Sequence, residues 1–164
     1  MMATTQTVRI PKLVGTILLC EGAGLSSGFL TVDGVRDWYP TLRKSSFNPP
    51  GALFGPVWTL LYGMMGAALH LVQQRDGTDR DVGQLARVLF SLQLALNILW
   101  SYIFFKRRSP LYALVEIACL WLAIALTVLA FARISKTAAL LMLPYLAWVS
   151  FAGVLNYSIW RLNA

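Results

Sequence analysis

Five long apolar runs separated by short polar turns constrain the fold of this chain more than any other feature of its sequence. Each run is close to the ~20 residues that a helix needs to cross a bilayer. Of the 164 residues, 57% are hydrophobic and 13% are charged, whereas about a quarter of a soluble domain is charged. The sequence therefore predicts an all-α membrane protein, residues 1–164 forming one bundle of five transmembrane helices, with approximate spans 13–32, 51–73, 83–105, 111–132 and 138–160.

The net charge of +7 does not indicate a nucleic-acid partner, because the cations lie in the short turns between apolar runs. In such turns they suit anionic lipid headgroups and influence orientation in the membrane. The two cysteines, Cys20 and Cys119, both fall inside apolar runs, and His70 is the single histidine. We therefore expect neither a disulfide framework nor a metal site.

The first apolar run leaves several interpretations open. A basic leader followed by an apolar stretch also fits a cleaved signal peptide, although this run is longer than such a segment usually is. Gly24 and Gly28 are spaced so that another helix could approach closely, in a dimer or within one bundle. Glu21 in this run, and Glu116 in the fourth, are acids at membrane depth, where they would either relay protons or pair with a cation.

The stretch between the first two runs, residues 33–50, is an unusual loop. It carries the aromatic pair Trp38-Tyr39 and then cations, and it ends in Pro49-Pro50, which bars a helix before that point. Rings and cations held on a stiff loop above a helix suit a lid over a pocket. The same residues also suit an aromatic belt at the membrane surface, and both interpretations stay open.

Polar side chains in the third run follow a helical spacing. Gln93, Asn97 and Trp100 are separated by four and three residues, so they share one helix face, which should point into the bundle. The chain is also rich in aromatic residues, with 6 Trp, 6 Tyr and 8 Phe. Aromatic faces with a few polar groups would bind a planar or sterol-like ligand, but they would equally pack helices together.

Several motifs in order make the chain resemble the translocator protein family, also called the peripheral benzodiazepine receptor or tryptophan-rich sensory protein family. The resemblance extends from about residue 15 to residue 163. Its motifs are Trp38-Tyr39, Lys44, Asn48-Pro49-Pro50 and Gly55-Pro56-Val57-Trp58, then Gln93, Asn97 and Trp100, and finally Pro144-Tyr145, Trp148, Phe151-Ala152 and Val154 to Arg161.

The resemblance implies a membrane receptor or carrier, often a homodimer, with a regulatory or stress role. Family ligands include porphyrins such as protoporphyrin IX, cholesterol in animal members, and isoquinoline-carboxamide or benzodiazepine drugs, and no cofactor is required. The membrane would be bacterial or the mitochondrial outer membrane. By position, the resemblance implies a ligand site under the first loop, formed by Tyr39, Phe54, Trp58, Asn97, Trp100, Tyr112, Trp148, Ala152 and Leu155.

Two alternative functions follow from the same resemblance. In some bacterial relatives, the tryptophans that match Trp58 and Trp148 support light-dependent oxidative degradation of the porphyrin, so the chain could be an enzyme with these catalytic residues. A sterol-transport role would instead use Leu155, Tyr157 and Arg161, which fit a loose sterol pattern.

The chain departs from the family at three places. Ser45-Ser46-Phe47 stands where the family usually has Pro-x-Trp, which implies a less rigid and less aromatic lid. Tyr112 replaces a tryptophan of animal members, and Glu116 replaces an aspartate. The first two departures concern the expected drug site, whereas the third keeps the charge.

Overall fold

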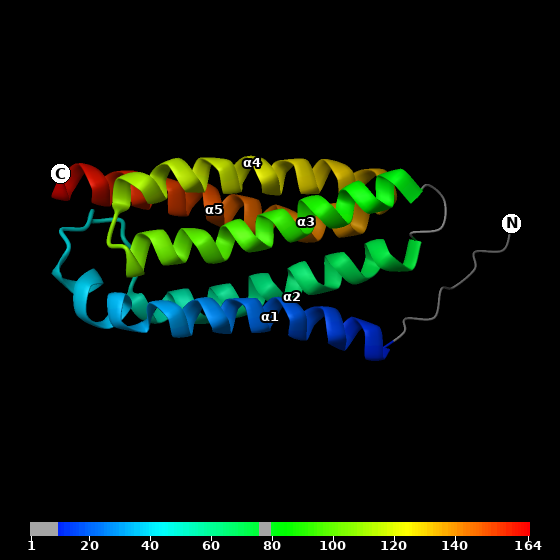
Figure 1. Cartoon of the computed structure of the whole chain (residues 1–164), viewed down its shortest axis with the longest axis horizontal. Helices are drawn as coiled ribbons and strands as arrows, with labels where there is room; N and C mark the ends of the chain where they lie inside the picture. The colour runs from blue at the N-terminus through cyan, green and yellow to red at the C-terminus, as the bar shows by residue number, and fades with distance from the viewer. Residues whose placement is uncertain (1–9, 76–79) are drawn as a thin grey trace, which may run out of the picture.

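The computed structural model describes residues 10–75 and 80–164, and this part of the chain is helical without strands. The five long helices run along one axis with alternating direction (Figure 1). All five are long and apolar enough to cross a membrane, which confirms the predicted fold class and makes this an integral membrane protein. The helices are α1 (Ile10–Asp33), α2 (Gly51–Arg75), α3 (Arg80–Ser101), α4 (Pro110–Ile134) and α5 (Lys136–Asn163).

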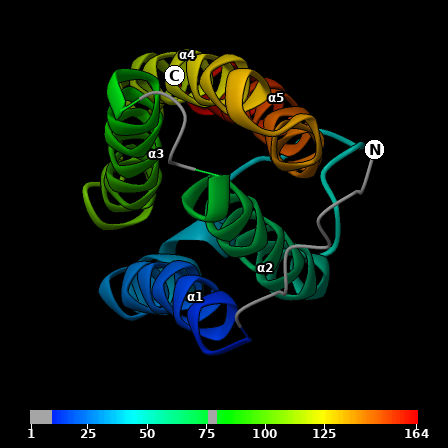
Figure 2. The same ribbon diagram turned by 90° about the vertical axis from the view of Figure 1, so that its right-hand side faces the viewer.

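The helices form a bundle in which α4 packs extensively on both α3 and α5, while α2 packs on both α1 and α5. In the view along the bundle, α1 and α2 lie on one side and α3, α4 and α5 on the other (Figure 2). Contacts between α2 and α3 are few. The two groups of helices are held together most extensively by the packing of α2 on α5.

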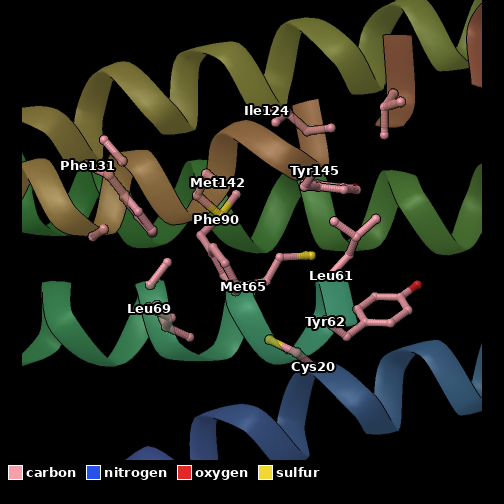
Figure 3. Packing of buried hydrophobic residues seen from close by; sticks show 14 of the residues in the cluster. Cys20, Leu61, Tyr62, Met65, Leu69, Phe90, Ile124, Phe131, Met142 and Tyr145 are labelled. Atoms are coloured by element: carbon pink, nitrogen blue, oxygen red, sulfur yellow. The ribbon is translucent and has the colours of Figure 1, made fainter. Parts of the chain in front are cut away.

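Large side chains fill the bundle away from that end. Phe90 of α3 stacks on Phe131 of α4 with ring centroids 5.8 Å apart, and Met65, Met142 and Tyr145 are fully buried beside them (Figure 3). Because lipid tails are as apolar as these side chains, burial from water does not drive helix association in a membrane. Tight packing and internal hydrogen bonds do so instead.

The first helix is longer than the sequence predicts. After α1, a π-helical turn (Gly34–Trp38) and a 3-10 turn (Tyr39–Thr41) continue the helix, so the predicted loop over residues 33–50 begins only after Thr41. The polar residues after α1 do not end it, because Arg36 pairs with Asp37 at 2.7 Å on the exposed helix surface. The leader ahead of residue 10 lies outside the described residues, so the signal-peptide interpretation stays a hypothesis.

Gly24 shows how the small residues of α1 are used. A methyl group at Gly24 would overlap the ring of Tyr62 on α2, so this glycine permits packing within the bundle. A methyl group at Gly28 would meet nothing within 4 Å. Of the two glycines, only Gly24 is needed for the packing of helices within the bundle.

Gly66 of α2 marks the closest approach between α1 and α2. A Cβ atom at Gly66 would lie 2.5 Å from Ile17 Cα and 2.8 Å from the Thr16 carbonyl oxygen. Both contacts are backbone, so we expect Gly66→Ala to push the helices apart and destabilise the bundle by about 1–3 kcal/mol. Thermal unfolding in one detergent checks this. Gly15→Ala is the control, since Gly15 has nothing within 4 Å; an equal midpoint for both variants would contradict the prediction.

Candidate functional site

A cavity of about 580 Å³ lies at the end of the bundle where the α1–α2 loop crosses. Residues from α1, α2, α3 and α5 line it, together with Tyr39 and Pro40 at the end of the extended first helix. Ligand pockets typically measure about 300–1,000 Å³, so this cavity has the size of a small-molecule site. Its aromatic lining residues are Tyr39, Phe54, Trp58, Tyr62, Trp100, Phe104, Phe105 and Trp148.

Two groups of rings line the cavity from different helices. On α2 and α5, Phe54 meets Trp148 edge to face with centroids 5.8 Å apart. Trp100 of α3 stacks on Phe104 of the π-helical turn that follows α3 (Tyr102–Lys106), with centroids 5.2 Å apart and an interplanar angle of 24°. The rings hold one another in place, because offset and edge-to-face pairs are the favoured aromatic geometries. They present apolar surfaces that a flat ligand could contact from more than one helix.

Asn97 forms the polar floor of the cavity. The Tyr62 hydroxyl donates to Asn97 Oδ1 at 2.5 Å, and Asn97 Nδ2 donates to the Tyr145 hydroxyl at 3.0 Å. These bonds join α2, α3 and α5 at one level of the membrane. A buried amide in hydrocarbon needs such partners, and the bonds fix the three helices at the depth where the cavity ends.

Comparison with known proteins agrees with this architecture. The model of the TspO/MBR family matches residues 16–161. The chain is 49% identical to the tryptophan-rich protein TspO of Chlorobaculum tepidum, over 93% of this chain and 98% of that protein. It is 38% identical to the translocator protein of Homo sapiens, over 94% of this chain and 90% of that protein. The chain belongs to the TspO/MBR family.

A further relative, the tryptophan-rich sensory protein of Cereibacter sphaeroides, is 36% identical over 90% of this chain and 89% of that protein. The family resemblance that the sequence motifs indicate is thus confirmed. Homodimer formation stays a prediction.

The family fold brings most of the predicted ligand residues to one cavity. Tyr39, Phe54, Trp58, Asn97, Trp100, Trp148, Ala152 and Leu155 all line it. Tyr112 does not: its side chain is 71% exposed on the first turns of α4, a helix that contributes nothing to the lining. Ligand contact through Tyr112 is therefore not supported by its place in this chain.

Asn156 of α5 is a site residue for which the sequence predicts no role of its own. Trp100 Nε1 donates to Asn156 Oδ1 at 3.1 Å, and Asn156 Nδ2 donates to the Pro110 carbonyl oxygen at 2.8 Å. Asn156 thereby fixes the Trp100 indole and ties α3, α4 and α5 together. Its signal in the sequence is an amide within an apolar helix, which requires partners on neighbouring helices.

Trp148 differs from Trp100, because its indole nitrogen is buried and has no hydrogen-bond partner among the described residues. A buried unpaired donor is costly. Since Trp148 lines the cavity, this N–H is a donor that a ligand could engage after a small ring movement.

The lid over the cavity is held at two points. Tyr39 Oη donates to Asn48 Oδ1 at 3.1 Å, and the Lys44 ammonium lies 4.6 Å from the centre of the Tyr39 ring. At the other point, the Arg43 backbone N–H donates to Asn163 Oδ1 at 3.0 Å, while Asn163 Nδ2 donates to the Arg43 carbonyl oxygen at 2.9 Å. The loop is thus fastened to the end of α5, as the lid interpretation expects, and the aromatic-belt interpretation stays open beside it.

The cations of the lid are not part of the cavity wall. Lys44 Nζ donates to the Leu42 carbonyl oxygen at 3.1 Å and folds back over the lid. Neither Arg43 nor Lys44 lines the cavity, and the same holds for the family departure Ser45-Ser46-Phe47. The positions of the usual proline and tryptophan therefore lie in the part of the loop outside the cavity wall.

The predicted sterol residues do not form one surface. Leu155 is buried and lines the cavity, whereas Tyr157 is half exposed and Arg161 is exposed on the opposite face of α5. Residues two apart on a helix point about 200° from each other, which explains the separation. Sterol binding through this pattern stays a prediction, and the arrangement of the three side chains does not favour it.

Of the two membrane acids, Glu116 is the one whose surroundings differ from the expected ion pair, while the roles expected of Glu21 stay predictions. Both carboxyl oxygens of Glu116 are buried without a hydrogen-bond partner in the described part of the chain. The cations Arg36 and Lys106 pair with Asp33 and Asp37 instead. The described residues thus support neither a cation partner for Glu116 nor a proton relay through it.

We expect Asn156→Leu to destabilise the bundle by about 1–3 kcal/mol, because the Trp100 N–H and the Pro110 carbonyl lose their partner. The emission of Trp100 should also change once the ring is free to move. Thermal unfolding and fluorescence check this. Ser101→Ala is the control, since Ser101 Oγ bonds only the Asn97 carbonyl within α3, at 3.3 Å. A variant as stable as this control would contradict the role of Asn156.

Proposed function

We propose that the chain is a membrane receptor or carrier that binds flat, largely apolar ligands of the porphyrin class, such as protoporphyrin IX, in the cavity under the lid. The observation that carries this proposal is the set of aromatic rings from α2, α3 and α5 around one cavity of about 580 Å³. A ring system that is planar and apolar over most of its surface gains most from such walls.

The polar groups of the site fit the edge of such a ligand. Trp148 Nε1 has no partner among the described residues, and Arg43 and Lys44 lie on the lid outside the cavity wall, where a cation would meet an acidic substituent that projects from the cavity. Charge-assisted hydrogen bonds of this kind fix orientation more than they add affinity at a solvated edge. The rings therefore supply the affinity in this proposal, and the lid supplies the orientation.

A cavity-filling variant tests the proposal. Gly28 of α1 lines the cavity and has nothing within 4 Å of an added Cβ atom, so Gly28→Leu should occupy ligand space without displacing the backbone. We expect its affinity for protoporphyrin IX to fall at least tenfold, which is about 1.4 kcal/mol. Quenching of tryptophan fluorescence during a titration in the dark measures this affinity.

The matched control is Gly22→Leu, because Gly22 is exposed on the same helix, also has open space and does not line the cavity. Both variants gain the same helix propensity. Equal protoporphyrin IX affinity in the two variants would place the ligand elsewhere and overturn the proposal.

Light-dependent oxidative degradation of the porphyrin is a second candidate function. It is favoured by the position of Trp58 and Trp148, which both line the one cavity. In this hypothesis an indole gives an electron to the light-excited porphyrin, and dioxygen adds to the resulting porphyrin radical anion. The oxygen adduct then returns one electron to the indole radical cation, so the indole is regenerated and dioxygen is the net oxidant of the porphyrin. Binding and degradation would use the same walls and need no acid–base residues.

We expect illumination of the bound protoporphyrin IX to bleach its absorption bands in the wild-type protein under air, and to leave them stable under argon. Trp58→Phe and Trp148→Phe should bind the porphyrin but slow the bleaching at least tenfold, since Phe is much harder to oxidise. Trp121→Phe is the control, because Trp121 lies outside the cavity wall. If the porphyrin absorption bands stay stable in the illuminated wild-type protein under air, the enzyme hypothesis is wrong and only the receptor or carrier function remains.

A further inference from the structure

A second hollow lies on the outside of the bundle, between α4 and α5. Its volume is about 410 Å³, and its lining includes Ile117, Trp121, Ser150, Gly153, Val154 and Tyr157. We call it the α4–α5 groove. It is separate from the cavity, because α5 turns Ala152 and Leu155 inward and Gly153 and Val154 outward.

The absence of a side chain at Gly153 creates the groove. An added Cβ atom there would come no closer than 4.0 Å to Ile117 Cγ2, so the space beside this glycine is open. The neighbouring side chains that border it are apolar, and Val154 is 54% exposed. In a membrane this surface faces acyl chains, so the groove is an indentation that such a chain can fill.

Polar atoms at the deep end of the groove are already satisfied. Trp121 Nε1 donates to Ser150 Oγ at 2.8 Å, and Ser150 Oγ donates to the Leu146 carbonyl oxygen at 2.8 Å. Ser150 lies at the middle of α5 (Lys136–Asn163), which is the middle of the membrane for a spanning helix. The groove therefore presents no unpaired donor at that depth, and it suits a hydrocarbon chain.

The groove and the helix end beyond it together match one leaflet of the bilayer: the lining on α5 runs from Val149 to Tyr157, about 12 Å along the helix, and Arg161 lies beyond it. Eleven residues separate Ser150 from Arg161, which is about 16 Å along a helix. The hydrocarbon core is about 30 Å thick, so half of it is about 15 Å. Tyr157 and Arg161 are four residues apart on the same face, and they reach the headgroup level where the chain of a lipid ends.

Arg161 is available to an anion. Its side chain is exposed, and no ion pair involves it among the described residues. The acids at this end of the bundle are engaged elsewhere, because Asp33 lies 3.7 Å from Arg36 and 3.8 Å from Lys106. Tyr157 adds a hydroxyl on the same face and is 50% exposed. A guanidinium beside a phenol is a suitable partner for a phosphate group.

We propose that the α4–α5 groove binds one anionic phospholipid of the surrounding bilayer. One acyl chain lies along the groove from Tyr157 past Gly153 toward Ser150, and the phosphate is bound by Arg161 and the Tyr157 hydroxyl. A sterol has only one hydroxyl and would leave the charge of Arg161 unused. A second copy of the chain would have to bring an acid to Arg161, and at this end Asp33 and Asp37 are paired already.

Native mass spectrometry of the full chain tests this proposal with phosphatidylglycerol and phosphatidylcholine of identical acyl chains. We expect the wild-type protein to retain one phosphatidylglycerol per chain, with at least a fivefold preference over phosphatidylcholine. Gly153→Leu fills the groove and should lower the retained fraction of both lipids at least fivefold. Arg161→Gln should keep chain binding but abolish the preference for phosphatidylglycerol.

Two matched variants serve as controls. Gly22→Leu adds the same side chain to another lipid-facing surface, and Arg133→Gln removes an exposed cation at the opposite end of α4. Both should bind lipid as the wild-type protein does. The thermal unfolding midpoint of each variant shows that it is folded, and Arg161→Gln tests the headgroup contact even if Gly153→Leu fails to fold.

Three results would overturn the proposal. The first is equal retention of the two phospholipids by the wild-type protein, or an unchanged preference in Arg161→Gln. The second is displacement of phosphatidylglycerol by an equimolar amount of cholesterol, which would make the groove a sterol site. The third is a Gly153→Leu variant that changes oligomeric state with no change in lipid retention, which would make the groove an interface between copies.

Discussion

The amide of Asn97 is the contact on which the ligand cavity depends. It accepts a hydrogen bond from Tyr62 on α2 and donates one to Tyr145 on α5, so three helices meet at one polar point inside an apolar bundle. Lipid offers these groups no other partner, so separating the helices would leave all three unpaired. These hydrogen bonds fix the floor of the cavity. They also fix the positions of α2, α3 and α5, which form the cavity walls above that floor.

The walls above this floor are stabilised by their own contacts and not by a ligand. Trp58 packs against Tyr62 at 5.5 Å and against Tyr145 at 6.1 Å, so a cavity ring rests directly on the floor. Trp100 is held by Asn156, and Phe54 by Trp148. A cavity formed in advance binds a rigid planar ligand with little loss of side-chain entropy, which favours affinity.

The sequence predicts the fold well, because membrane-spanning helices can be recognised from their length and hydropathy. It also places Asn97 and Trp100 on an inward face, since helical spacing alone determines that. The same rule places Gln93 on this face, and Gln93 is fully buried, although its amide has no hydrogen-bond partner among the described residues. The extension of α1 to Thr41, the outward position of Tyr112 and the Asn156 bridge depend on contacts between distant segments. Neither hydropathy nor motif spacing carries that information.

The contacts of α5 also indicate how a ligand reaches the cavity. Asn163 at the end of α5 fastens the lid through two exposed hydrogen bonds to Arg43, and breaking both costs about 1–3 kcal/mol because water can replace them. Entry from the side would separate helices and break the buried bonds of Asn97 and several ring contacts together, with no replacement in lipid. Breaking the two hydrogen bonds between Arg43 and Asn163 therefore costs less free energy than separating the helices. A ligand that entered at the membrane surface would pass the loop that carries Ser45-Ser46-Phe47, which lies outside the cavity wall.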